Sequence, residues 1–88
     1  MYRSRGRVVG KDVCPLSFVE TGEEAVIVDV QAGRGLIGRL LHMGIYPGTR
    51  IRVISNNVHG PVIIGIGEKR IGLGRGMCNK IIVRRLGL

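Results

Sequence analysis

The chain has 88 residues and a formal net charge of +8, and 44% of its residues are hydrophobic, with Ile, Val and Leu in excess over aromatics. This length indicates one small domain and leaves little room for a deep catalytic cleft, because such a chain buries only about 60–70% of its unfolded surface. No apolar run reaches the roughly 18 residues of a membrane-spanning helix, and the basic N-terminus is not typical of a secretory signal.

The N-terminal third predicts an arm, a turn and one strand. Residues 1–14 are polar and basic, and we expect a poorly ordered arm there, followed by a domain over 15–88. An entry turn is expected over 15–22. Residues 25–30 predict the first strand of the domain, because valine and isoleucine dominate them. Alternation then assigns one face of this strand to Val26, Val28 and Val30, and the other to Ile27 and Asp29.

The middle of the chain predicts one helix, one tight turn and a second strand. Apolar residues recur at helical spacing over 36–43, and Gly44 stands where a left-handed C-terminal cap is favoured. Pro47-Gly48 is typical of a turn in which proline fixes φ and glycine accepts a positive one. Residues 49–54 alternate strictly between arginine and branched aliphatic residues, which predicts a strand with one wet face.

The last third predicts three more strands. Residues 62–67 and 70–73 are expected to form a hairpin that turns at 68–69, and 81–85 a last strand that closes a barrel. Residues 74–80 are rich in glycine, which disfavours a helix there. The fold expected from these elements is mainly β: a small five-stranded SH3-like barrel with one short α-helix between the first two strands.

One segment resembles a known family. Residues 39–54, RLLHMGIYPGTRIRVI, are similar to the core signature of the ferrous iron transport protein A (FeoA) family, which has an Arg-Leu pair, a Met-Gly, a Pro-Gly and an alternating strand at this spacing. Residues 15–30 look like the family's entry, glycine turn and first strand, and residues 60–62 like its loop into the third strand. The resemblance covers roughly residues 15–85.

The resemblance implies an SH3-like barrel in the cytoplasm that is not an enzyme and needs no cofactor. Family members are thought to dock on the membrane ferrous-iron permease FeoB, which carries a cytosolic GTP-binding domain, and to modulate it. The same barrel resembles the C-terminal domain of iron-dependent repressors.

Four residues are the candidate partner-binding site. Met43, Tyr46 and Pro47 cluster at the helix end and the following turn, and Arg39 belongs to the same motif. A partly exposed Met and Tyr often mark a contact patch, although helical spacing favours Met43 as a core residue. A tyrosine before a Pro-Gly turn is hard to bury, which makes Tyr46 the stronger candidate.

Phosphate and metal sites are not indicated. Gly65-Ile66-Gly67 and residues 72–76 lack the lysine-hydroxyl ending of a P-loop and are expected as hairpin and bulge glycines. The residues that bear metal-ligand atoms form no short CxxC or HxxxH pair, so transition-metal binding remains a weak alternative. These residues are Cys14, Cys78, His42 and His59.

Nucleic-acid binding is the main alternative function. A basic balance favours an acidic partner, which is either nucleic acid, an anionic membrane surface or an acidic protein surface. Eight basic residues could share one face of a small barrel, although the chain has few aromatics for base stacking. They are Arg50, Arg52, Lys69, Arg70, Arg75, Lys80, Arg84 and Arg85.

Overall fold

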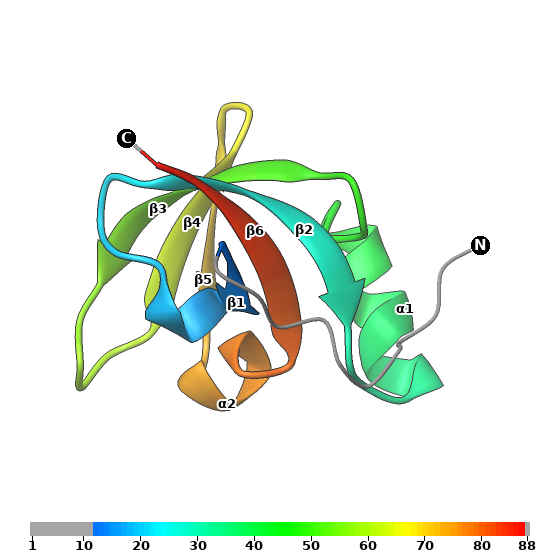
Figure 1. Cartoon of the computed structure of the whole chain (residues 1–88). Coiled ribbons are helices and arrows are strands. Elements are labelled where there is room, and N and C mark those ends of the chain that lie inside the picture. Colours follow the sequence, from blue (N-terminus) through cyan, green and yellow to red (C-terminus); the bar gives the residue numbers. More distant parts are fainter. Residues whose placement is uncertain (1–11, 88) are drawn as a thin grey trace.

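A computed structural model describes residues 12–87, which form one antiparallel sheet that curves around an apolar core, with two short α-helices at its ends (Figure 1). The strands follow one another in the sheet in the order β1-β6-β2-β3-β4-β5. Within residues 12–87, no helix is both long and apolar enough to cross a membrane. The elements in chain order are β1 (Val13–Pro15), the 3₁₀-helix η1 (Leu16–Phe18), β2 (Glu24–Val30), α1 (Arg34–His42), β3 (Arg50–Asn56), β4 (Val62–Ile66), β5 (Lys69–Leu73), α2 (Arg75–Cys78) and β6 (Ile81–Gly87).

The mainly β class is confirmed, but the expected count of five strands is wrong. The additional strand is β1, in which Cys14 pairs with Val83 of β6. It begins inside the expected arm, whose residues 1–11 lie outside the described part of the chain. The main helix α1 therefore lies between β2 and β3, not between the first two strands, and it begins two residues earlier than predicted.

The prediction of no helix within 74–80 is also wrong. Residues of α2 make helical hydrogen bonds, with the Cys78 amide donating to the Gly74 carbonyl at 3.0 Å. Cys78 is completely buried and Met77 packs against the core. Burial of these two side chains outweighs the cost of about 1 kcal/mol for the helical glycine.

The sheet is curved but not closed by hydrogen bonds. Its end strands β1 and β5 each pair with one neighbour, and no pairing joins them to each other within the described residues. The 3₁₀-helix η1 contacts both α2 and β6. The last strand β6 does pair with β2, the first strand expected from the sequence, but no described pairing joins it to β5, so the ring of hydrogen bonds is incomplete.

The predicted alternation of β2 is confirmed for Val26 and Val28 on one face and Ile27 on the other, and it fails at Val30. Ala25 and Ile27 are fully buried, whereas Val26 and Val28 are only half-buried on the outer face. The register against β6 shifts between Ile27 and Asp29, which is a β-bulge that turns the following residue inward. Val30 consequently joins the core.

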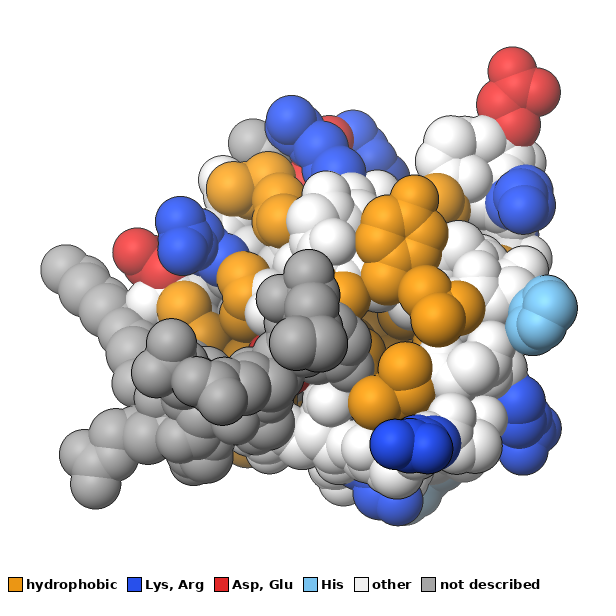
Figure 2. Space-filling view, turned by 90° about the vertical axis from the view of Figure 1, so that its right-hand side faces the viewer, with side chains coloured by type: hydrophobic (Ala, Val, Ile, Leu, Met, Phe, Trp, Pro, Cys, Tyr) orange, Lys and Arg blue, Asp and Glu red, His pale blue; other side chains and the backbone are white. Residues whose placement is uncertain are grey.

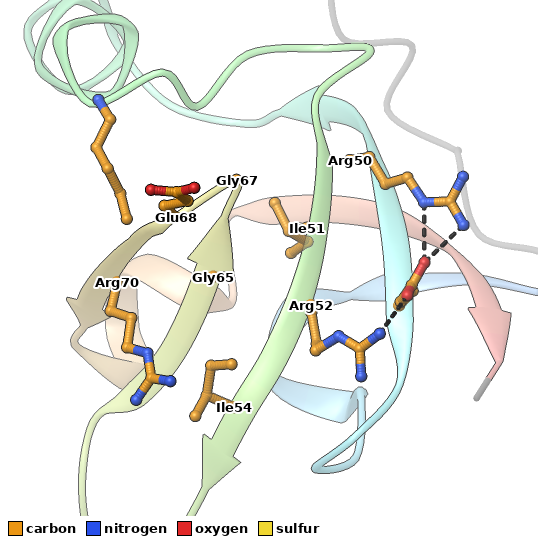
Figure 3. A pocket seen from close by; sticks show the side chains of 10 residues that line it. Arg50, Ile51, Arg52, Ile54, Gly65, Gly67, Glu68 and Arg70 are labelled. Carbon is orange, nitrogen blue, oxygen red and sulfur yellow. Dashed lines mark hydrogen bonds and ion pairs between the residues drawn. The ribbon is translucent and has the colours of Figure 1, made fainter.

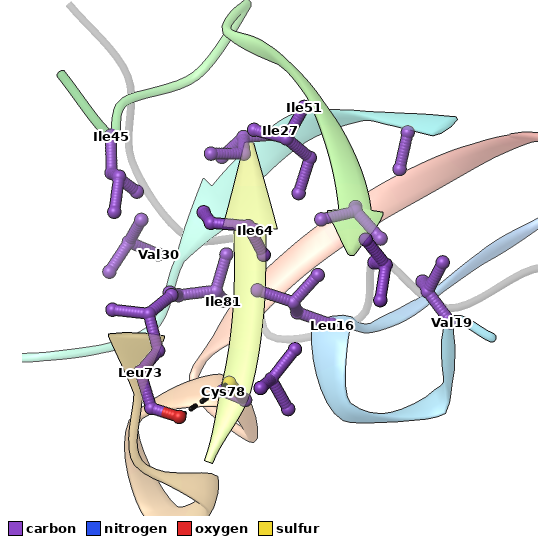
Figure 4. Packing of buried hydrophobic residues seen from close by; sticks show 14 of the residues in the cluster. Leu16, Val19, Ile27, Val30, Ile45, Ile51, Ile64, Leu73, Cys78 and Ile81 are labelled. Atoms are coloured by element: carbon purple, nitrogen blue, oxygen red, sulfur yellow. Dashed lines mark hydrogen bonds between the residues drawn. The ribbon is translucent and has the colours of Figure 1, made fainter. Parts of the chain in front are cut away.

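The core consists almost entirely of branched aliphatic side chains, which pack between the sheet, α1 and the entry segment (Figure 4). Leu16 and Val19 enter it from the segment before β2, and Leu40 enters it from α1. Fully buried side chains of this kind contribute about 1.5–3 kcal/mol each relative to exposure. Apolar side chains therefore fill most of the interior enclosed by the sheet.

Asn56 at the end of β3 connects three segments through its side chain. The amide nitrogen donates to the carbonyls of Ser17 at 3.1 Å and Val19 at 2.6 Å, and the amide oxygen accepts from Arg75 Nη2 at 2.6 Å. These bonds attach the entry segment and α2 to the same end of the sheet.

We expect Asn56→Ala to lower the free energy of unfolding by about 2 kcal/mol, because the substitution leaves two carbonyls and a guanidinium without this partner. Urea unfolding followed by circular dichroism measures the change. The exposed neighbour provides the control: Asn57→Ala should change stability by less than about 0.5 kcal/mol. Equal effects of the two substitutions would show that Asn56 does not connect these segments.

Candidate functional site

The candidate site is built around a tight turn between α1 and β3. Gly44 ends α1 with a φ of +82°, and the Ile45 amide donates to the Leu40 carbonyl at 2.8 Å, which confirms the predicted helix cap. The Thr49 amide then donates to the Tyr46 carbonyl at 3.0 Å, and Gly48 has a φ of +98°. Proline at the second position and glycine at the third are the requirements of a type II turn.

This turn is fixed to the central strand of the sheet. The Gly48 amide donates to the Ile27 carbonyl at 2.7 Å, and the Ile27 amide donates to the Thr49 carbonyl at 2.9 Å. The Thr49 hydroxyl also donates to the Gly44 carbonyl at 3.0 Å. Tyr46 therefore lies on a short loop that is held at both ends.

Beside the turn, the outer faces of β2 and β6 form a shallow depression of about 370 Å³, which we call the apolar groove. Tyr46 precedes Pro47, which lines the apolar groove, and its side chain is 47% exposed. Leu86 also lines the groove and is 45% exposed. Figure 2 shows hydrophobic side chains gathered across the middle of the α1 side of the molecule, with lysine and arginine at the margins. The lining residues are Val26, Ile27, Val28, Pro47, Gly48, Arg84 and Leu86.

The four predicted partner-binding residues differ in how far they are exposed. Pro47 lines the apolar groove and Tyr46 is next to it, whereas Met43 is partly buried against the core. Arg39 is exposed on α1. The sequence reasoning did not identify Val26, Val28 and Leu86, because it gave the two valines a common face without assigning that face to the surface, and it ended the last strand at residue 85.

Glu24 anchors two arginines on the outer face next to the apolar groove. Its carboxylate accepts from Arg50 Nε at 2.9 Å and Nη2 at 2.6 Å, and from Arg52 Nη2 at 2.6 Å. The hydrogen bonds from Arg50 and its positive charge lower the pKa of Glu24. The three charged groups are thereby held in fixed positions, while both arginine side chains remain more than half exposed.

A further ion pair joins Glu23, which precedes β2, to Arg85 of β6. Glu23 accepts from Arg85 Nε at 3.0 Å and Nη2 at 2.6 Å, and also from the Glu20 amide at 3.0 Å. The Arg85 hydrogen bonds are the main cause of a lowered pKa for Glu23. Because the Glu23 side chain is only 10% exposed, this pair is more shielded from solvent than the Glu24 pairs.

The FeoA domain family model matches residues 14–85, which is most of the chain. The chain belongs to the FeoA family. A Methanocaldococcus jannaschii protein named "Putative Fe(2+) transport protein A" is 44% identical over 69 residues, which cover 78% of this chain and 83% of that protein. The resemblance found in the sequence is therefore confirmed.

Solved structures confirm the SH3-like fold. The crystal structure of an iron uptake regulatory protein (FeoA) has 34% identity and a TM-score of 0.77, and the match covers 84% of this chain and 97% of that chain. A zinc complex of Stenotrophomonas maltophilia FeoA, described as a procaryotic SH3 domain protein, has 23% identity and a TM-score of 0.67 over 77% of this chain and 86% of that one.

The candidate metal-ligating residues lie on different elements. Cys14 is half-buried in β1, Cys78 is buried in α2, His42 is exposed at the end of α1, and His59 is exposed in the loop after β3. Residues 12–87 contain no group of three or more His, Cys, Asp or Glu side chains placed to hold a metal ion.

The eight basic residues of the nucleic-acid alternative are not all available to bind a partner. Arg75 donates to Asn56 and Arg85 to Glu23, so both take part in internal contacts. Four of the others line one depression at β3 and β5: Arg50, Arg52, Lys69 and Arg70.

The lowered pKa of Glu23 predicts a loss of stability in acid. A carboxyl whose pKa is lower in the folded state stabilises the fold fully above its usual value of 4.5, and this contribution is lost as the pH falls below that value and through the folded pKa. We expect Glu23→Gln to lower the free energy of unfolding by about 1 kcal/mol at pH 7, and to reduce its fall between pH 5 and pH 2.5.

Urea unfolding at a series of pH values measures this difference. Glu68→Gln is the matched control, since Glu68 is exposed and forms no ion pair among residues 12–87. A Glu23→Gln protein whose stability follows the same pH curve as the unsubstituted protein would contradict the assignment.

The buried thiol of Cys78 should resist alkylation. Burial is the main cause that raises its pKa to about 11, so only about one thiol in a thousand is ionised at pH 8. We expect iodoacetamide to modify Cys78 at least tenfold more slowly in the folded protein than in urea, as measured by peptide mass spectrometry. Equal rates in the two conditions would show that the thiol is not buried in the core.

Proposed function

We propose that this protein is a non-catalytic cytoplasmic accessory of ferrous iron uptake that binds the cytosolic portion of a FeoB-type permease and modulates it. Membership of the FeoA family and the name of the Methanocaldococcus jannaschii relative support a role in Fe²⁺ transport. The main support for the proposed binding site is the apolar groove, which lies beside Tyr46 on a turn that hydrogen bonds hold to β2. Exposed apolar surface of this kind marks a contact site on a small protein.

The turn is suited to binding because it loses little freedom on association. Its hydrogen bonds to Ile27 already fix the backbone that carries Tyr46 and Pro47. Preorganisation reduces the entropy that binding otherwise costs. Tyrosine adds a large apolar ring with a polar tip, which is why it is common in the energetic centres of interfaces.

Charge complements this apolar contact. The chain has a net charge of +8, and Arg84 lines the apolar groove, so an acidic partner surface would be attracted and oriented before contact. Once docked, the protein shifts the permease between conformations only to the extent that it binds one of them more tightly.

We expect Tyr46→Ala to leave the fold intact and to weaken binding to the permease by at least about tenfold, which corresponds to about 1.4 kcal/mol. The measurement is co-purification and titration with a detergent-solubilised candidate permease. Urea unfolding should show a stability change of about 0.5 kcal/mol or less, because the ring is half exposed.

Phe18→Ala is the matched control, since this aromatic side chain is 65% exposed on η1 and does not line the apolar groove. Permease binding that is unchanged in Tyr46→Ala, or equally weakened in Phe18→Ala, would remove the groove as the site. Absorbance at 260 nm on the same samples shows whether nucleic acid co-purifies instead.

A further inference from the structure

A second depression of about 430 Å³ lies on the outer face of β3, β4 and β5 (Figure 3), and we call it the basic groove. Four basic and two acidic residues line it, so its net charge is positive. It goes beyond the proposed function, which depends on the apolar groove between β2 and β6. The charged lining residues are Glu24, Arg50, Arg52, Glu68, Lys69 and Arg70.

The register of four strands explains the hollow at the centre of the basic groove. Glu24 pairs with Arg52, Arg52 with Gly65, and Gly65 with Arg70, so these four residues form one row across the sheet. Residues in one such row point to the same face. Gly65 contributes no side chain to this row, and the side chain of Ile54 packs over it between the two arginines.

The two arginines are spaced to hold an anionic group between them. Neighbouring strands lie about 4.8 Å apart, which puts the Cα atoms of Arg52 and Arg70 about 10 Å apart, with the strand of Gly65 between them (Figure 3). Arg52 uses one nitrogen for Glu24, and the described residues include no ion pair of Lys69 or Arg70. Several N–H donors are therefore free to bind an incoming anion.

The bottom of the basic groove is apolar. The side chain of Ile54 lies over Gly65. A Cβ atom at Gly65 would be 3.3 Å from the Cδ1 atom of Ile54. A site for bare phosphate normally adds free backbone N–H groups, whereas strand amides are committed to the sheet. A carboxylate, Glu24, already occupies one wall. These features favour a ligand with carboxylates around an apolar side chain.

We propose that the basic groove binds an acidic, extended peptide segment of a partner protein, with an Asp or Glu carboxylate between Arg52 and Arg70 and an apolar side chain against Ile54. Arg52 already binds one carboxylate on this face, because its Nη2 atom donates to Glu24 Oε2 at 2.6 Å.

The test uses a fluorescein-labelled peptide, Glu-Asp-Leu-Asp-Glu-Gly, and a matched amide peptide, Gln-Asn-Leu-Asn-Gln-Gly, in fluorescence anisotropy titrations with the whole chain. We expect saturable binding of the acidic peptide only. Arg70→Glu should weaken it at least tenfold, whereas Lys80→Glu, with the same change of net charge at an exposed position outside the basic groove, should change it less than twofold.

A pair of glycine substitutions tests the shape of the basic groove without changing its charge. Gly65→Ala displaces the side chain of Ile54, whose Cδ1 atom would be 3.3 Å from the added Cβ, and should weaken peptide binding several-fold. Gly72→Ala is the control, because its Cβ meets a similar neighbour, Ile63 Cδ1, also at 3.3 Å, but does not line the basic groove. Urea unfolding of both variants shows whether either substitution acts through stability.

Three results would overturn the proposal. Equal binding of the amide peptide would show that carboxylates are not recognised, and equal loss in Arg70→Glu and Lys80→Glu would show attraction by net charge alone. Displacement of the acidic peptide by micromolar single-stranded oligo-dT would assign the groove to nucleic acid. None of these readouts involves a permease, so failure here and failure of the proposed function are distinguishable.

Discussion

The structure depends on the position of β2 in the middle of the sheet, where it pairs with β6 on one side and β3 on the other. This double pairing fixes which side chains of three strands face inward. The bulge before Asp29 turns Val30 to the core, and the chain enters α1 from there. The pairing also holds the Tyr46–Thr49 turn, because the last bonds between β2 and the chain before β3 involve Ile27, Gly48 and Thr49.

The strands that sequence reasoning predicted best were those with unlike residues on their two faces. In β3, arginine alternates with isoleucine and valine, and the predicted orientation of Ile51 and Val53 toward the core is confirmed. In β2, alanine, valine and isoleucine occupy both faces, so alternation alone did not identify the inner one. The bulge that changes the inner face depends on pairing with β6, more than fifty residues away in sequence.

Local turn chemistry was also predictable from the sequence, whereas the grooves were not. Gly44 and the Pro47-Gly48 pair have the conformations that their types favour, which placed Tyr46 on a turn. The apolar groove needs Leu86 of β6 beside Val26 of β2, and only long-range pairing brings them together. Helix α2 was missed because its stability comes from burial of Cys78, which overrides a poor local propensity.

Both grooves lie on the outer face of the same sheet, and Glu24 stands where they meet: it lines the basic groove and lies two residues before Val26 of the apolar groove. The two grooves together span the five strands from β6 to β5 in the sheet order. At a spacing of about 4.8 Å, these strands extend over about 20 Å. A standard protein interface covers about 800 Å² on each partner, which is wide enough to include both grooves. Such an interface combines an apolar centre that loses its water with charged groups that orient the partner. In a chain this small, the core takes up the inner face of the sheet, and the outer face is where glycines and exposed apolar residues can shape a binding surface.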